Sequence, residues 1–408
     1  MKRERWHKKE VTLTWNTRKT SFAVAQELFS SHEVDAGSRL LLRSIEVANL
    51  PEHGHAFDFG SGYGVLGLAL RDALPGWTVQ LVDRDALAVA FSQWNVERLE
   101  FANGSVRSGV GLGLDSAPEP GCDLILWNVP GKAGEPVLDE LTHDVARALA
   151  DGGLAALVVV NPLAKVIRDG LRADEAITVV HDEEHAEHTI IHARRVGAGT
   201  RPTDPFERGV FDREIGQFGV DDFDYDITPV VGLPEYDTYG FATQVVFDAL
   251  QTIEGNVNSM LIMRPGQGHV PLVAANRLHP QRLAMIDRDQ LALRASVRAL
   301  VDAGLRVPKI EMVASPDLIE VPIGDGFSLA ILMLEDQVRN EIHIARLGDL
   351  ATLIEPGGNI IVGGTSSVVS RFLSFAAKTN AWKVRDRIKR SGASAARLEA
   401  FPAGRANH

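Results

Sequence analysis

Asp58-Phe59-Gly60-Ser61-Gly62-Tyr63-Gly64-Val65-Leu66-Gly67 is the stretch of sequence that decides the fold. An apolar run precedes it and an amphipathic run follows it, so it predicts a tight turn between a buried strand and a helix. Glycine suits such a turn because the backbone can bend sharply and approach a ligand without a Cβ in the way, while the next helix offers free N–H groups. The stretch therefore predicts a nucleotide-type ligand.

The composition is that of a folded protein with more than one domain. A chain of 408 residues is too long for one hydrophobic core, so two domains are expected. Hydrophobic residues make up 45% of the chain, yet no apolar run approaches the roughly 18 residues of a membrane span. The basic N-terminal segment has no apolar stretch behind it, unlike a secretory signal. We therefore expect a cytoplasmic protein with no membrane partner.

Cysteine and histidine give no strong prediction of a metal site. The single cysteine, Cys122, excludes an intrachain disulfide and a multi-cysteine zinc site, and its apolar neighbours predict a buried, inert thiol. Four histidines at positions 181, 185, 188 and 192 are dense enough to suggest a metal. They fall on an expected hairpin that would spread them over two strands and a turn, so we expect no metal.

The chain repeats itself. Residues 58–95 align without a gap with residues 262–299, at a constant shift of 204 residues. A later segment, residues 150–158, matches a second one at a shift of 205. Each half alternates apolar runs with amphipathic ones, which predicts a parallel sheet covered by helices.

The repeat sets the expected domains and elements. We expect domains over residues 1–198 and 199–408, joined by a linker over 197–205 that is rich in turn-forming residues. The expected strands of the first half are 55–59, 78–82, 123–127 and 154–160, and the expected helices are 35–48, 64–73, 86–99 and 136–150. A closing hairpin is expected over 178–194.

The two copies differ at polar positions. Asp58 corresponds to Ile262, Gly60 to Arg264, Asn95 to Ala299 and Asn128 to Met333. The first half keeps the residues of a small-molecule site, and the second replaces them with apolar or bulky ones. We therefore expect the active site in the first half and a degenerate domain in the second.

The residues around the glycine-rich turn reduce the number of ligand classes that it could bind. Gly62-Tyr63-Gly64-Val65-Leu66-Gly67 satisfies the dinucleotide pattern G-x-G-x-x-G, with Asp83 placed for a ribose. Asp58, however, would repel a pyrophosphate and attract an ammonium group. This favours a ligand with a cationic end, such as S-adenosylmethionine. The pattern of a nucleoside triphosphate loop is missing, because Ala133 follows Gly131-Lys132.

A second polar turn follows the strand 123–127. Asn128-Val129-Pro130 would fix an amide and a backbone carbonyl outside the sheet, where open α/β folds bind ligands. Together, the glycine-rich turn, Asp83 and this turn resemble the successive motifs of class I S-adenosylmethionine-dependent methyltransferases. Residues 29–42 are similar to the entry segment of the small methyltransferase domain, which occurs in tandem in ribosomal RNA guanine-N2 methyltransferases.

The resemblance implies two tandem Rossmann-like domains with mostly parallel seven-stranded sheets flanked by helices, the second degenerate. It implies an S-adenosylmethionine-dependent N-methyltransferase of RNA, acting in ribosomal RNA processing on an exocyclic amine such as that of guanine. The implied cofactor-binding residues are Asp58, Gly60, Gly62, Gly64, Asp83 and Asn128, and the implied catalytic residues at the acceptor end are Asn128 and Pro130.

Other readings of the sequence stay open. Val129 replaces the first proline of the Asn-Pro-Pro-aromatic pattern of the amino-methylating relatives, and Gly131 replaces its aromatic residue. The acceptor could instead be a protein side chain or a small metabolite, or both copies could form a non-catalytic binding module. Trp127 or Trp94 could replace the missing aromatic, although a core position is the simpler expectation for each.

A basic segment near the C-terminus is the candidate for RNA binding. Its cations are Lys383, Arg385, Arg387, Lys389 and Arg390. Such a run could bind a phosphate backbone, and the alternative is a solvated helix and tail. The net charge of −12 argues against a protein coated for nonspecific binding of nucleic acid.

Overall fold

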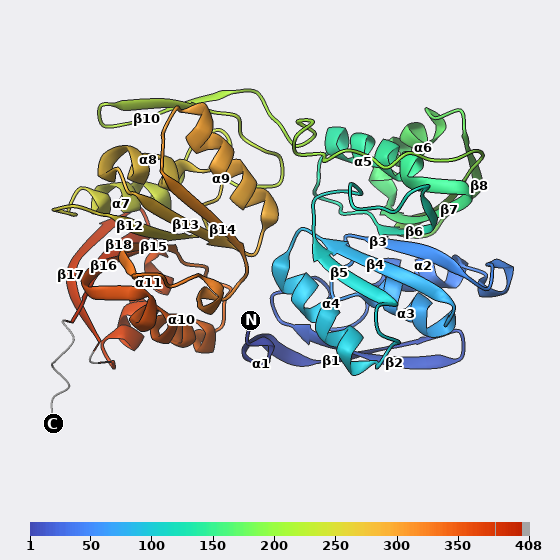
Figure 1. Cartoon of the computed structure of the whole chain (residues 1–408), viewed down its shortest axis with the longest axis horizontal. Helices are drawn as coiled ribbons and strands as arrows, with labels where there is room; N and C mark the ends of the chain where they lie inside the picture. The colour runs from blue at the N-terminus through green and yellow to red at the C-terminus, as the bar shows by residue number, and fades with distance from the viewer. Residues whose placement is uncertain (380, 402–408) are drawn as a thin grey trace. The chain divides into compact units, whose positions relative to one another are not determined.

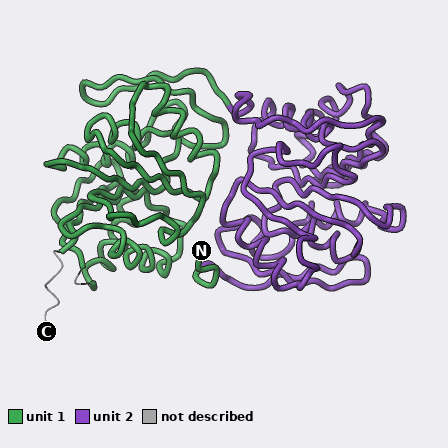
Figure 2. The backbone as a smooth tube through the Cα atoms, viewed as in Figure 1, with its two compact units in different colours: residues 1–5, 212–408 green, residues 6–211 purple. Residues whose placement is uncertain are grey.

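The computed structural model describes residues 1–379 and 381–401, which form two units of one architecture (Figure 1). Residues 6–211 form the first unit, and the described residues from 212 onward form the second together with residues 1–5 (Figure 2). Each unit holds a seven-stranded sheet, with strand order β5-β4-β3-β6-β7-β9-β8 in the first and β14-β13-β12-β15-β16-β18-β17 in the second. The predicted repeat is therefore confirmed.

The first unit has mostly parallel strands with helices between them. Its sheet consists of β3 (Gly54–Phe59), β4 (Trp77–Asp83), β5 (Val106–Val110), β6 (Cys122–Asn128), β7 (Leu149–Val160), β8 (Ile177–Glu184) and β9 (His188–Arg195). Its helices are α2 (Ala36–Ser44), α3 (Val65–Ala73), α4 (Ala86–Arg98), α5 (Glu135–Ala148) and α6 (Ala164–Arg172). A hairpin of β1 (His7–Trp15) and β2 (Arg18–Ala25) precedes them, and β2 contacts α3 and α4.

The second unit repeats this order. Its sheet consists of β12 (Ser259–Met263), β13 (Arg282–Asp287), β14 (Lys309–Ala314), β15 (Phe327–Met333), β16 (Ile354–Thr365), β17 (Trp382–Arg390) and β18 (Ala393–Ala400). Its helices are α7 (Phe241–Leu250), α8 (His269–Leu278), α9 (Gln290–Asp302), α10 (Asn340–Leu353) and α11 (Ser366–Ala376), preceded by the hairpin of β10 (Gly216–Val220) and β11 (Phe223–Ile227). The repeat extends to helix caps: Asp85 and Asp289 begin α4 and α9 with the same φ of −91° and ψ of 109°.

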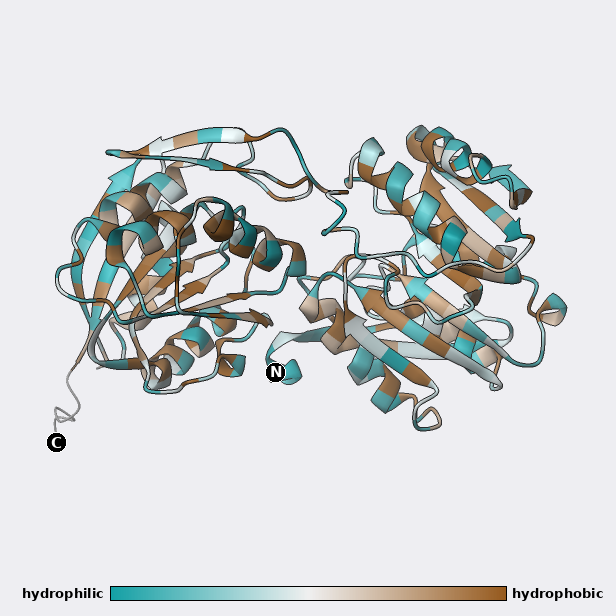
Figure 3. Cartoon of the chain, turned by 45° about the horizontal axis from the view of Figure 1, so that its top comes forward, coloured by the Kyte–Doolittle hydropathy of each residue, from teal (hydrophilic) through white to brown (hydrophobic). Residues whose placement is uncertain are grey.

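The core of each unit is its central strands. Most side chains of β3, β6 and β12 are buried because helices lie against the sheet. Figure 3 shows hydrophobic residues along the strands of both units. Trp127 is buried with its ring 5.2 Å from that of Phe59, so its predicted core position is confirmed. Cys122 is also buried, and burial raises the pKa of its thiol to about 12, which agrees with the predicted inert thiol.

The segment after β9 packs on the first unit. The backbone N–H of Thr200 donates to the carbonyl of Arg147, and Phe206 is buried. Arg208 binds the carboxylate of Asp144 on α5, whose side chain is fully buried. Within the linker expected over 197–205, Pro202 and Pro205 are buried and most other residues are exposed. The division between the units falls after residue 211 rather than after 198.

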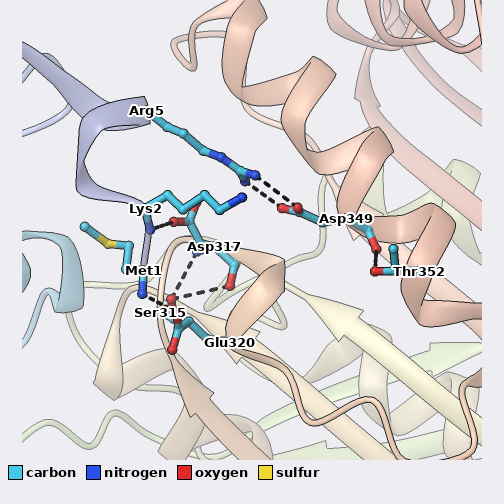
Figure 4. A network of polar contacts seen from close by, with 8 residues as sticks. All are labelled: Met1, Lys2, Arg5, Ser315, Asp317, Glu320, Asp349 and Thr352. Carbon is cyan, nitrogen blue, oxygen red and sulfur yellow. Dashed lines mark hydrogen bonds and ion pairs between the residues drawn. The ribbon is translucent and has the colours of Figure 1, made fainter.

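The first residues of the chain pack in the same manner on the second unit (Figure 4). Arg5, on the short helix α1 (Arg3–Trp6), donates twice to the carboxylate of Asp349 on α10, at 2.8 and 3.2 Å. The backbone N–H of Lys2 donates to Asp317 at 3.0 Å. Asp349 and Asp144 are 205 residues apart, the shift of the repeat. Each copy therefore uses one aspartate on the same helix to hold an arginine from a segment that precedes a hairpin.

Removal of Arg208 should destabilise the first unit in a pH-dependent way. Arg208→Ala leaves the carboxylate of Asp144 buried beside only the half-exposed Arg147, at a cost of about 2 kcal/mol at pH 8. Burial, opposed by Arg208, raises the pKa of Asp144 to about 6, and the pKa rises further without that guanidinium. A raised folded pKa means stability lost as pH rises, so the deficit should shrink at pH 5.

Urea unfolding of the variant and the wild type at pH 5 and pH 8 measures this effect. Asp144→Asn added to Arg208→Ala should recover most of the loss, because it removes the buried charge. A deficit of the same size at both pH values would contradict the role assigned to Asp144.

Candidate functional site

The glycine-rich turn joins β3 to α3 at the carboxyl end of the sheet. Gly60, Gly62 and Gly64 have φ values of 67°, 55° and 91°, in the region that L side chains rarely adopt. A Cβ on Gly60 or Gly62 would meet no atom within 4 Å, so the space beside the turn is open. A Cβ on Gly64 would lie 2.8 Å from Leu68, so this glycine serves the packing of α3.

Asp58 lies fully buried beneath the turn. Its Oδ2 accepts a hydrogen bond from the N–H of Gly67 at 2.8 Å, which ties the end of β3 to α3. Its Oδ1 is buried and has no hydrogen-bond partner among the described residues. Burial, opposed by the Gly67 N–H and reinforced by Asp83, raises the pKa of Asp58 to about 7. A nearby cation would favour the ionised carboxylate.

Asp83 ends β4 beside the same turn. Its Oδ2 accepts from the N–H of Gly62 at 2.8 Å, and its Oδ1 accepts from the N–H of Asp85 at 2.9 Å. Burial, together with the charge of Asp85, raises the pKa of Asp83 to about 6. Each carboxylate oxygen keeps a second lone pair, so the half-buried side chain can still accept from ligand hydroxyls.

Asn95 on α4 holds the glycine-rich turn by hydrogen bonds. The sequence showed that Asn95 differs from its counterpart Ala299 but did not show this role. The side chain is fully buried. Its Oδ1 accepts from the N–H of Ala23 at 2.8 Å, and its Nδ2 donates to the carbonyls of Ala23 and Tyr63 at 3.1 and 3.0 Å. One amide thus holds the hairpin strand β2 and the glycine-rich turn together.

Asn128 lies half-buried at the end of β6. Its Nδ2 donates to Oδ2 of Asp35 at 2.9 Å and to Oγ of Ser38 at 3.0 Å. Asp35 is the N-cap of α2 and accepts from the backbone N–H of Ser38 with the same oxygen. The structure therefore brings the predicted Asn128 together with two residues of the entry segment, a contact that the sequence did not predict.

The residues after Asn128 bring no ring to the site. Val129 is buried, and its N–H donates to the carbonyl of Val158 on β7. Gly131 is exposed, and a Cβ there would meet only Val160, at 3.7 Å. The departures from the Asn-Pro-Pro-aromatic pattern thus leave an open surface beside Pro130.

The second unit fills the corresponding turn with a side chain of its own. Arg264 stands in the place of Gly60 with a φ of 61°. Its Nε lies 3.4 Å from Glu335, and it donates to the carbonyl of Met333. Burial raises the pKa of Asp287, the counterpart of Asp83, to about 7, and the charge of Arg264 opposes this rise. A guanidinium therefore lies where the first unit has open space.

The histidines at positions 181, 185, 188 and 192 lie along the hairpin of β8 and β9. No group of three His, Cys, Asp or Glu among the described residues could hold a metal ion. His181 and His192 lie on the paired strands β8 and β9, with ring centres 5.1 Å apart.

Within the described part of the chain, no helix has the length and apolar character needed to cross a membrane.

The basic segment is a strand at the edge of the second sheet, not a helix and tail. Its side chains alternate between faces: Arg387 contacts Ser366 and Ser370 on α11, whereas Arg390 contacts Gln244 on α7. Arg385 pairs with Glu399 of β18. Lys383 and Lys389 are exposed. Charged residues on an edge strand also prevent pairing with another sheet.

Comparison with known proteins shows the family to which the first unit is similar. Residues 19–174 match the methyltransferase small domain. The uncharacterized protein YbxB of Bacillus subtilis is 32% identical over 151 residues, which cover 36% of this chain and 73% of that protein. The chain belongs to the methyltransferase small domain family. The cofactor of these methyltransferases is S-adenosylmethionine, as the resemblance implied.

One further sequence relative matches part of this chain, and one solved structure matches nearly all of it. Ribosomal RNA small subunit methyltransferase C of Ectopseudomonas mendocina is 36% identical over 137 residues, which cover 32% of this chain and 39% of that protein. The chain thus spans about two-fifths of that relative's length. The Thermus thermophilus 16S rRNA N2 G1207 methyltransferase, in complex with AdoMet and guanosine, superposes with a TM-score of 0.69 at 15% identity. That match covers 98% of this chain and all of the other, so the tandem fold is shared.

The first unit fits the cofactor of its family. Gly60 and Gly62 leave open space where a side chain would lie, and the orphan Oδ1 of Asp58 suits a ligand with positive charge. Asp83 offers acceptors for vicinal hydroxyls. The corresponding space of the second unit holds Arg264, so the same fit is not available there.

Affinity for S-adenosylmethionine should fall as the pH is lowered through the pKa of Asp58. The cationic cofactor favours the ionised carboxylate, and with a pKa of about 7 a drop from pH 7.0 to pH 5.5 should weaken binding by more than about tenfold. The amino group of the cofactor stays protonated over this range, so the change reports on the protein. Isothermal titration calorimetry measures it.

Asp58→Asn is the matched variant for this experiment. It keeps an acceptor for the N–H of Gly67 but has no charge, so its affinity should be lower. The smaller pH dependence that remains should come from Asp83, whose pKa of about 6 lies in the same range. Circular dichroism at each pH controls for unfolding. Affinity of the wild type that does not change over this range would show that Asp58 does not ionise on binding.

Proposed function

We propose that the first unit transfers a methyl group from S-adenosylmethionine to an exocyclic amine of ribosomal RNA. The observation that carries this proposal is the survival of Asp58, Gly60 and Asn128 in one copy only, in the geometry described above. Ribosomal RNA as the acceptor is supported by the names of the relatives and by the tandem fold.

Bound S-adenosylmethionine supplies a methyl group on a positively charged sulfur, already activated for transfer. The residues of the chain therefore need to bind and orient two molecules. Gly60 and Gly62 let the backbone approach the cofactor, while the carboxylate of Asp58 attracts its positive end. Asp83 accepts from the ribose hydroxyls, which fixes the direction in which the methyl group points.

Asn128 acts at the acceptor end. With both N–H groups of its amide engaged by Asp35 and Ser38, its Oδ1 accepts an N–H of the acceptor amine and directs the nitrogen lone pair toward the methyl group. The acceptor nitrogen then bonds to the methyl carbon as the carbon–sulfur bond breaks, with its electron pair left on sulfur. The nitrogen finally releases a proton to solvent.

Replacement of Asn128 should abolish most of the transfer without loss of the cofactor. Asn128→Ala removes the acceptor of the amine hydrogen bond, and a loss of about 10² in kcat is expected from the removal of one positioned hydrogen-bonding group. Met333→Ala, at the corresponding position of the second unit, is the matched control and should keep wild-type activity. The assay measures methyl transfer to ribosomal RNA isolated from cells that lack the protein.

Mass spectrometry of nucleosides tests the acceptor directly. Ribosomal RNA from cells that lack the protein should miss one N-methylated base, and the wild-type gene should restore it whereas Asn128→Ala should not. A complete set of ribosomal RNA methylations in those cells would count against RNA. It would favour a protein side chain or a metabolite, which the open surface at Gly131 admits.

The edge strand β17 is the proposed contact for the phosphate backbone. Lys383 and Lys389 are exposed, whereas three of its arginines bind other side chains. Lys383→Ala combined with Lys389→Ala should reduce the slope of log affinity for ribosomal RNA against log salt by about 1 to 2, one unit or less for each lost phosphate contact. Filter binding at several salt concentrations measures the slope. An unchanged slope would remove β17 from the RNA interface.

A further inference from the structure

The first turn of α2 holds the side chain of Asn128 in one orientation. We propose that Asp35 and Ser38 are positioning residues that turn Oδ1 of Asn128 toward the acceptor and thereby select a neutral N–H nucleophile. This inference rests on the proposed function and adds to it the residues that orient the amide of Asn128 and the reason that anionic nucleophiles are disfavoured.

The orientation follows from the chemistry of the partners. The two ends of an amide have nearly the same shape, so an asparagine side chain can present either its oxygen or its nitrogen. An ionised carboxylate only accepts hydrogen bonds, so Nδ2 of Asn128 must face Asp35. Oγ of Ser38 accepts the second N–H. No described residue donates to Oδ1, which is left to an incoming group.

Asp35 is itself fixed. As N-cap of α2 it accepts from the backbone N–H of Ser38 at 3.0 Å, and this bond sets the direction of its carboxylate. Gly37 allows the close approach, because a Cβ there would lie 2.9 Å from Oδ2 of Asp35 and 3.2 Å from the ring of His188. The cap bond therefore fixes the direction of the Asp35 carboxylate, and the missing Cβ of Gly37 leaves room for it.

The charge of the Asp35 carboxylate decides which methyl-accepting groups are favoured at Asn128. A carboxylate that accepts from Nδ2 polarises the amide, which makes Oδ1 a stronger acceptor. An exocyclic amine can donate one hydrogen to Oδ1 and keep its lone pair free for the methyl group. A carboxylate or a thiolate would meet the lone pairs of Oδ1 and the charge of Asp35, so anionic nucleophiles are disfavoured.

The second unit lacks the aspartate and the asparagine of this arrangement, and keeps only a hydroxyl, that of Thr243, three residues after its N-cap. Its α7 begins after Gly240, which has no side chain to cap the helix, and Met333 stands in the place of Asn128. Glu235 instead accepts from the N–H of Gly240 and the hydroxyl of Thr243. Asp35 and Asn128 are thus present together in the first unit, and both are replaced in the second.

Two substitutions of Asp35 separate positioning from helix capping. Asp35→Ser keeps a side-chain cap for α2 but is too short to reach Asn128, so kcat for methyl transfer to the undermethylated ribosomal RNA should fall by more than tenfold. The dissociation constant for S-adenosylmethionine and the melting temperature should stay near those of the wild type. Asp35→Asn keeps an oxygen for both bonds and should recover most of the activity. Ser38→Ala, which removes one of two acceptors, should have a smaller effect than Asp35→Ser.

A crystal structure of Asp35→Ser supplies a readout that does not depend on catalysis. We expect the amide of Asn128 to turn over or to lose its fixed orientation. Wild-type kcat in Asp35→Ser, or an Asn128 amide that keeps its orientation there, would overturn the positioning role. Absence of transfer by the wild type would instead overturn the proposed function, and the crystal structure would still decide whether Asp35 orients the amide.

Discussion

The buried carboxylate of Asp58 beneath the glycine-rich turn is the interaction on which the site depends. Burial of a carboxylate is costly unless its oxygens are bonded, and here only one oxygen has a partner, the N–H of Gly67. Asp58 therefore has a raised pKa and one buried oxygen without a hydrogen-bond partner among the described residues. A cationic ligand relieves this cost. The second unit avoids it altogether, since Ile262 packs there in the core.

Duplication has kept the structural bonds of the domain and lost those of the ligand site. Asp85 and Asp289 cap the same helix in the same geometry, and Asp144 and Asp349 each hold an arginine from outside the sheet. These bonds stabilise a helix or close a surface, whatever the domain binds. Open space at Gly60, by contrast, has value only for a ligand, and in the second unit Arg264 occupies it and satisfies the nearby acids.

Most of the fold could be predicted from the sequence because its strands are continuous apolar runs bounded by glycine. The predicted strands and helices of the first half agree with the structure within a few residues at most ends. The hairpin β1–β2 and the edge strand β5 gave no such signal: Val106–Val110 contains polar residues and glycine, and an edge strand needs no continuous apolar face. The bond of Asn128 to Asp35 joins residues 93 apart in the chain, so only the folded structure could show it.

The same bond changes how the departures at Val129 and Gly131 are understood. An aromatic ring after the asparagine would hold a base by its face, which contributes affinity but does not set the direction of the nitrogen lone pair. That direction depends on the amide, and the amide is held by the side chains of Asp35 and Ser38, not by Val129 or Gly131. Under the proposed function, loss of the ring removes affinity for a base and leaves the orientation of the Asn128 amide unchanged.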